Sequence, residues 1–263
     1  MAANTNPKVH MGTITGGEGR DLYKQNPVVL LPMGSHEDQG PHAPMGDYLL
    51  AEKIAELAAL RANERGVRTV VAPVLPFGGA DWFGPMPGGI AISQATLTSV
   101  IADMLESLQR HELSRLIIIN GHGGNVTPIA EVTRDIYSNG GPLIPSLYLW
   151  RIGYGLLPKI VGAEKSAKVS GHGADPLTSI GLHLFPELMR PDLMPDARPL
   201  KRDQAPGAAG LWAGDRAAPR NGRRHALLHA LRPPHGWFTR RREGWSKHRR
   251  RRTGGGNRGA ADQ

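Results

Sequence analysis

The sequence contains no cysteine, and this absence removes several classes of chemistry at once. Disulfide frameworks, thiolate metal sites, iron–sulfur clusters and cysteine nucleophiles all require the thiol. The chain also lacks any apolar run near the length of about 20 residues that a membrane-spanning helix needs. Residues 1–21 hold no apolar segment of the kind found in signal peptides. We therefore expect a cytoplasmic protein with no membrane partner, which fits the lack of cysteine.

Positive charge is scarce in most of the chain and concentrated at its end. The formal net charge is +9 over 263 residues. Residues 201–263 carry 16 Lys and Arg against 4 Asp and Glu, a net charge of +12. The preceding residues carry 16 basic against 19 acidic side chains, a net charge of −3. The overall basic character, which by itself suggests a nucleic-acid partner, thus belongs to the last segment alone.

Residues 195–263 form a basic, low-complexity tail with three interpretations. Arg, Gly, Pro and Ala dominate it, and residues 249–252 are an unbroken run of arginine. The tail is disordered, or it is an arm that binds nucleic acid, or it is the translation of an out-of-frame 3′ end. A non-catalytic nucleic-acid-binding protein is accordingly the alternative function. We expect no nucleic-acid partner, because Trp237, Phe238 and Trp245 are too few and too irregular to interleave with the arginines.

Residues 25–194 alternate between strand and helix patterns, and we take them as one domain behind an N-terminal extension of residues 1–24. Short apolar runs predict strands, and apolar residues at helical spacing predict helices. Such alternation predicts a three-layer α/β/α sandwich around a mostly parallel sheet, with functional loops beyond the C-terminal ends of the strands. The strands are expected at residues 26–32, 68–75, 116–119 and 143–149, and the helices at 49–64, 94–111 and 125–137.

Three loops combine histidine, acidic residues and glycine. The first, PMGSHEDQGPHAPMGD at residues 32–47, directly follows the first predicted strand and contains Glu37 and Asp47. The second, NGHGGN at residues 120–125, follows the third strand and contains His122. The third, GHGADPLTS, spans residues 171–179. One such histidine is usually an ordinary hydrogen-bonded loop residue, but three clusters favour a site for Zn²⁺, Mn²⁺ or Fe²⁺, which imidazole and carboxylate ligands suit.

The order of these motifs over roughly residues 25–190 resembles the creatininase family. The resemblance implies a metal-dependent amidohydrolase, with a metal-activated water that cleaves a linear or cyclic amide, and a homo-oligomer, in this family a hexamer. By position, Glu37, Asp47 and His122 match the primary metal ligands, and Asp47 would bridge to a second metal. His172 matches a histidine placed for proton transfer or substrate contact. Asp175 falls where many members have a glutamate, so it is a candidate for both metal binding and catalysis.

The chain departs from the family pattern at the second metal. Gln39 stands where members usually have a histidine that binds this metal, and an amide oxygen is a weaker, neutral ligand. Leu177 stands where many members have a glutamate before Thr-Ser. The sequence is therefore compatible with either one or two metal ions per subunit.

The substrate side of the site is less specific. Backbone N–H groups of Gly123 and Gly124 are candidates to hold a developing oxyanion. His42, Trp82 and Trp150 are candidates to line a small-molecule pocket, although ordinary packing explains the tryptophans equally well. Family members act on creatinine, formamides, peptide ends and cyclic keto-sugars, and nothing in the sequence chooses among them.

Overall fold

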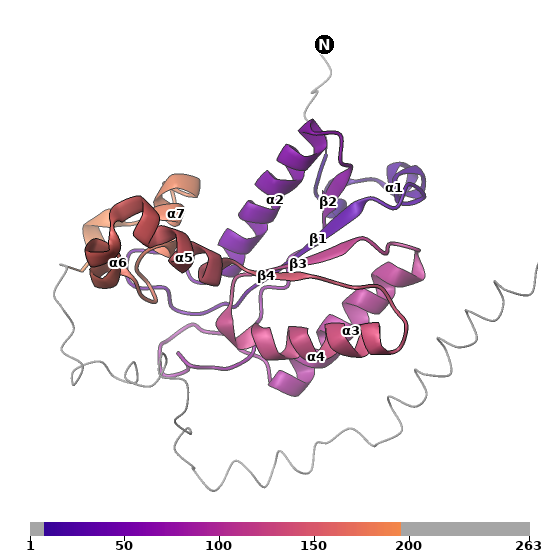
Figure 1. The fold of residues 1–263 in the computed structure, drawn as a ribbon. Helices are drawn as coiled ribbons and strands as arrows, with labels where there is room; N and C mark the ends of the chain where they lie inside the picture. The colour runs from indigo at the N-terminus through magenta and orange to yellow at the C-terminus, as the bar shows by residue number, and fades with distance from the viewer. Residues whose placement is uncertain (1–7, 196–263) are drawn as a thin grey trace, which may run out of the picture. The chain divides into compact units, whose positions relative to one another are not determined.

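A computed structural model describes residues 8–195 of the chain. The basic tail, with all three of its interpretations, lies outside the described residues. Within them, the structure has a four-stranded parallel sheet in the order β2-β1-β3-β4 (Figure 1). The strands are β1 (Val28–Met33), β2 (Thr69–Val71), β3 (Leu116–Asn120) and β4 (Ser146–Tyr148).

The strand order fixes where a site can form. From β1 the chain crosses to β2 on one side, and from β2 it returns to β3 on the other side of β1. Leu30 of β1 pairs with Val71 of β2 and with Ile117 of β3. The loops after β1 and β3 therefore diverge at the switch point of the sheet, where ligands bind in open α/β folds.

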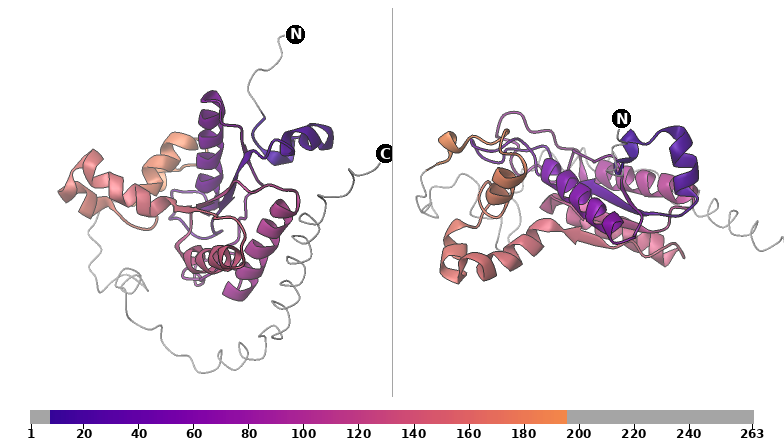
Figure 2. Two further views of the ribbon diagram at one scale, coloured as in Figure 1. Left: turned by 45° about the vertical axis from the view of Figure 1, so that its right-hand side comes forward. Right: turned by 90° about the horizontal axis from the view of Figure 1, so that it is seen from above.

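Helices cover both faces of the sheet, which confirms the predicted α/β/α sandwich (Figures 1 and 2). On one face lie α3 (Gln94–Arg110) and α4 (Val126–Ser138), and Leu97 and Ile101 of α3 pack in one cluster with Leu31. On the other face lies α2 (Tyr48–Glu64), which places Ala55 and Ala59 against the sheet. Small alanine side chains let this helix approach the strands closely.

The N-terminal segment belongs to the folded sandwich from residue 8 onward. Val71 N–H donates to the carbonyl of Val9, and Leu22 is part of the core. The helix α1 (Gly16–Tyr23) begins with a capping box between Thr15 and Glu18, and a short 3-10 helix, η1 (Met11–Thr13), precedes it. The segment that we predict as an N-terminal extension, residues 1–24, thus contains Leu22, which packs in the core.

Between β4 and residue 195 the chain forms three further α-helices, which lie together off one end of the sheet (Figure 1). The predicted strand 143–149 is only Ser146–Tyr148, and a helix begins directly at Leu149. Trp150 and Leu177 from this region form a small apolar cluster with Leu50 of α2. Among the described residues, no helix has both the length and the apolar content needed to cross a bilayer. The remaining elements are η2 (Gly123–Asn125), α5 (Leu149–Val161), α6 (Ala163–Val169), α7 (Leu177–Leu184) and η3 (Pro191–Leu193).

Candidate metal centre

The structure brings Glu37, Asp47 and His122 together in one buried cluster. The Nδ1 atom of His122 lies 3.2 Å from Oε1 of Glu37 and 3.3 Å from Oδ2 of Asp47. One ligand atom from each residue lies within 4.8 Å of the others. The three residues are 7%, 3% and 2% exposed, respectively. Two carboxylates and an imidazole converging in a buried site are the donor set of a divalent ion such as Zn²⁺ or Mn²⁺.

The fold places each ligand at the carboxyl edge of the sheet. Glu37 lies four residues after the end of β1, and His122 lies two residues after the end of β3. Asp47 occupies the N-cap position of α2, the helix that follows the first loop. Because β1 and β3 are parallel neighbours, their carboxyl ends meet at one edge. Two loops that are far apart in the sequence thus supply one site.

Hydrogen bonds from the NGHGGN segment hold His122 in place. Asn120 brackets the residue, since its Oδ1 accepts from the N–H of His122 at 3.0 Å and its Nδ2 donates to the carbonyl at 2.8 Å. The Nε2 atom of His122 lies 2.9 Å from the carbonyl oxygen of Gly79, to which it donates. This contact leaves Nδ1 as the nitrogen that faces the carboxylates. Histidines that bind a metal usually donate their other ring N–H to a carbonyl or carboxylate in the same way.

Asn125 ties the same segment to its neighbours. Its Nδ2 donates to the carbonyl of Gly34 at 3.0 Å, and its Oδ1 accepts from the N–H of Gly79 at 3.2 Å. The side chain thereby links the loops after β1, β2 and β3. Sequence reasoning singled out the histidine and glycines of the motif and missed both asparagines. Their place beside His122 in one tight loop was the signal available.

The charges of the cluster depend strongly on one another. Burial raises the pKa of Asp47 to about 6, although the hydrogen bond and charge of His122 lower it. Burial alone would lower the pKa of His122, but its hydrogen bonds to Asp47 and Glu37 and the charges of these two carboxylates outweigh burial and raise that pKa to about 10. Without a metal, the imidazolium therefore supplies the positive charge that the two buried carboxylates require. A divalent cation would supply that charge in its place.

Tyr148, which sequence reasoning missed, lies next to this cluster at the end of β4. Its hydroxyl lies 3.0 Å from the position that a Cβ atom on Gly123 would occupy, and the ring of Trp82 lies 3.3 Å from the same point. Burial first, and then the charges of Asp47 and Glu37, raise the pKa of Tyr148 to about 12. The phenol is therefore protonated at neutral pH and can donate a hydrogen bond. Its position as the last residue of a parallel strand was the sequence signal.

The predicted pocket residues take different places. Trp82 is 48% exposed, and its ring centroid lies 5.5 Å from that of His122. Trp150 is instead buried in the apolar cluster with Leu50 and Leu177, and its indole N–H donates to the carbonyl of Gly121. His42 is also buried, with Nε2 3.0 Å from the hydroxyl of Thr178. Trp82 is thus placed to meet a substrate, whereas Trp150 supports the loop before His122.

His172 and Asp175 lie outside the group of metal ligands. His172 is exposed, stacks on Phe83 with ring centroids 3.8 Å apart, and has Nε2 2.5 Å from the carbonyl oxygen of Asp38. Asp175 Oδ1 accepts from the N–H of Ser179 at 3.1 Å and from its hydroxyl at 2.6 Å. Within residues 8–195, the grouped ligands do not include Asp175, whose carboxylate is engaged in the first turn of α7.

Comparisons with known proteins identify relatives of this chain. The creatininase profile, described as creatinine amidohydrolase, matches residues 13–245. A mycofactocin precursor peptide peptidase of Mycolicibacterium smegmatis is 34% identical over 122 residues, 46% of this chain and 48% of that protein. A 3-dehydro-scyllo-inosose hydrolase of Thermotoga maritima is 27% identical over 201 residues, 73% of this chain and 61% of that protein. The chain spans about half the length of the first relative and about three fifths of the second.

Solved structures match over more of the chain. A manganese form of creatininase is 25% identical, with a TM-score of 0.59 over 74% of this chain and 80% of that one. A Zn–Zn form of a creatininase variant is 25% identical, with a TM-score of 0.57 over 72% of this chain and 78% of that one. Because the profile matches most of the sequence and the fold agrees, this chain belongs to the creatininase family.

Proposed function

We propose that this chain is a metal-dependent amidohydrolase that cleaves a C–N bond of a small amide with water. The observation that carries the proposal is the buried cluster of Glu37, Asp47 and His122 at the switch point of the sheet. The relatives support it, since a peptidase by its name cleaves a C–N bond, and creatininases are found with manganese and with zinc. The ion most suited to the donor set is Zn²⁺, with Mn²⁺ or Fe²⁺ as alternatives.

The residues of the site have different proposed roles. Glu37, Asp47 and His122 would hold the ion, which when bound supplies a Lewis acid and lowers the pKa of water. The hydroxyl of Tyr148 is available as a donor to a carbonyl oxygen that gains negative charge. Trp82 lies against His122 and shields one side of the cluster from water.

His172 is the candidate to move a proton to the leaving nitrogen. Phe83 and the carbonyl of Asp38 hold its exposed ring beside the loop that carries Glu37. An imidazole can both accept and donate a proton, which suits this role. Asp175, the second candidate for this role, accepts from the N–H and the hydroxyl of Ser179 through one carboxylate oxygen.

Metal removal tests the proposed function directly. We expect the purified protein, loaded with Zn²⁺ or Mn²⁺, to hydrolyse at least one member of a panel of creatinine, formamides and short peptides. EDTA should abolish this turnover, and restoring the ion should recover it. The released amine is measured. Turnover that persists undiminished in EDTA would contradict the mechanism, as would a panel-wide absence of turnover in fully metal-loaded protein.

Tyr148→Phe is expected to lower kcat about 10- to 100-fold while metal affinity changes less than about twofold. The change removes only the hydroxyl, so the ring still fills its place beside Gly123. Steady-state kinetics and a Zn²⁺ titration provide the two measurements. Tyr137→Phe is the matched control, because Tyr137 is 60% exposed on α4. Wild-type kcat in Tyr148→Phe would exclude the hydroxyl from the reaction.

We further propose that the protein is a cytoplasmic homo-oligomer, for which the family resemblance implies a hexamer. Apolar residues Ile152, Leu156 and Ile160 are 45%, 47% and 75% exposed and follow one another at four-residue spacing on α5. Such a stripe on one helix face favours burial against another subunit. Leu156→Glu is expected to reduce the mass measured by light scattering after gel filtration. An unchanged mass would contradict a role for this face.

A further inference from the structure

The oxygen atoms of Asp47 are not equivalent. Oδ2 faces His122 at 3.3 Å, but Oδ1 accepts from the backbone N–H of Ser35 at 2.7 Å. The backbone is also packed tightly there, because a Cβ atom on Gly34 would lie 2.5 Å from this Oδ1. A carboxylate that bridges two ions usually gives one oxygen to each. In this chain, Oδ1 already accepts from a backbone donor, which occupies one of its two lone pairs and makes it the poorer metal ligand of the two oxygens.

Besides His122, Glu37 has a second side-chain donor, Gln39. Gln39 is 5% exposed, and its Nε2 donates to Oε1 of Glu37 at 3.3 Å. That same oxygen lies 3.2 Å from Nδ1 of His122. The opposite orientation of the amide would set its oxygen against the Glu37 carboxylate, two acceptors without a proton between them. The positive end of the amide therefore faces the ligand, where it stabilises the carboxylate and disfavours a neighbouring cation.

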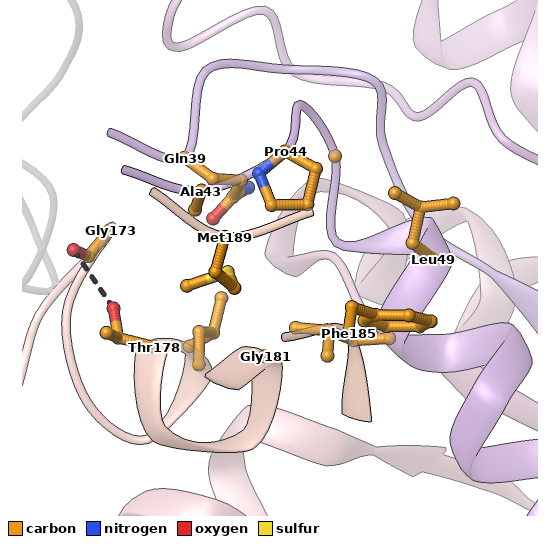
Figure 3. Close-up of a pocket in the computed structure, with 12 residues that line it drawn as sticks. Gln39, Ala43, Pro44, Leu49, Gly173, Thr178, Gly181, Phe185 and Met189 are labelled. Carbon is orange, nitrogen blue, oxygen red and sulfur yellow. Dashed lines mark hydrogen bonds between the residues drawn. The ribbon is translucent and has the colours of Figure 1, made fainter. Parts of the chain in front are cut away.

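The other end of the Gln39 amide is turned away from the cluster. Its Oε1 is buried and has no hydrogen-bond partner among the described residues. Gln39 lines a largely apolar cavity of about 20 Å³, enough for about one water molecule (Figure 3). An amide oxygen used as a metal ligand would have to leave this cavity and displace the N–H that now contacts Glu37. Other residues around the cavity are Pro44, Leu49, Thr178, Phe185 and Met189.

We propose that this site binds a single divalent ion per chain, and that Gln39 is a positioning residue whose N–H holds Glu37 in place for that ion. The proposal deepens the proposed function, on which it rests for the first ion. The second ion implied by the family does not fit, because Asp47 Oδ1 already accepts from the N–H of Ser35 and Gln39 presents a donor to Glu37. A one-ion site differs from the resemblance-based expectation that Asp47 bridges two metals.

Counting ions in the unaltered protein tests the proposal without any variant. Metal-free full-length protein is titrated with Zn²⁺ and with Mn²⁺ by calorimetry, and the dialysed product is analysed for metal content. We expect one ion per chain with either metal. A creatininase that gives a Zn–Zn form serves as the positive control for two ions. Two ions per chain in this protein would overturn the proposal, whatever its activity. Failure of the proposed function appears separately, as absent turnover with a normal ion count.

Gln39→Leu tests the positioning role. Loss of the N–H donor to Glu37 is expected to weaken Zn²⁺ binding about 10- to 100-fold, as for other outer-shell partners, with one ion still bound. Gln109→Leu is the matched control, because Gln109 is a half-buried residue of α3 whose amide atoms are shielded from solvent and have no hydrogen-bond partner among the described residues. Gln39→Met, which keeps an unbranched side chain, replaces Gln39→Leu if the latter does not fold. Unchanged Zn²⁺ affinity in a folded Gln39 variant would refute the positioning role.

Discussion

Replacing His122 by alanine is expected to weaken Zn²⁺ binding more than about 100-fold and to reduce hydrolysis by at least about 1,000-fold. His122 supplies the only nitrogen of the buried cluster, and both carboxylates point at it. Without the imidazole, only two oxygen ligands remain from these residues, too few for a structural or catalytic zinc site. Calorimetric titration with Zn²⁺ and turnover of the substrate found in the amide panel are the measurements.

His111→Ala is the matched control for this substitution, because His111 is exposed at the C-terminal end of α3. It should bind metal and turn over substrate as the unaltered protein does. Circular dichroism separates loss of the site from loss of the fold. If His122→Ala fails to fold, Glu37→Gln removes one ligand charge at nearly constant shape and should also weaken binding. Full activity in either variant would mean that the reaction does not use this cluster.

Local signals explain why the central elements could be predicted from the sequence. The helix α3 begins at Gln94, as the pattern over residues 94–111 predicts, and the Ser93 side chain caps it by accepting from the N–H of Thr96 at 3.1 Å. The strands β1 and β3 are continuous apolar runs, which is typical of strands buried on both faces. The same order of strands and helices predicts that the loops carrying Glu37 and His122 meet at one edge of the sheet. The alternation of strands and helices, and the parallel sheet that it predicts, were therefore sufficient to place these two site residues near each other.

The helices after β4 lacked such signals. The helix α5 contains two glycines and Pro158, residues that normally interrupt helices. Pro158 lies near the C-terminal end of α5, where its carbonyl accepts from the N–H of Gly162. Apolar contacts of Trp150 with Leu50 stabilise this region instead of local propensity. Tertiary packing of this kind has no period that a sequence pattern could reveal.

Contacts between distant loops were also beyond prediction. The Nε2 of His122 meets the carbonyl of Gly79, and the ring of His172 meets the carbonyl of Asp38. Neither pair shares a strand or a helix, so neither has a fixed spacing. Gln39 could be identified as a departure from the family pattern, but the direction of its amide depends on Glu37. A motif thus gives the residue types of a site, whereas folding determines which of their atoms meet.

The two glycines after His122 are expected to differ sharply in their tolerance of alanine. A Cβ atom on Gly124 would lie 2.2 Å from the carbonyl oxygen of Gly79 and 2.7 Å from Nε2 of His122. That carbonyl is the group to which His122 Nε2 donates, so the backbone around Gly79 must move and the imidazole loses its orienting partner. On Gly123, the nearest atoms are the Tyr148 hydroxyl at 3.0 Å and the Trp82 ring at 3.3 Å, which are ends of side chains that can shift.

Gly124→Ala is therefore expected to weaken Zn²⁺ binding at least about 100-fold and to destabilise the fold by about 1–3 kcal/mol. Gly123→Ala should leave metal affinity within a few-fold and act mainly on turnover, through the displaced Tyr148 hydroxyl. Gly155→Ala is the control for alanine substitution itself, since a Cβ there meets nothing within 4 Å on α5. Zn²⁺ titration and thermal unfolding of the three variants decide the matter. Equal metal affinity in Gly124→Ala and Gly123→Ala would show that the Gly79 carbonyl does not set the orientation of His122, and that both glycines serve only to expose backbone N–H groups.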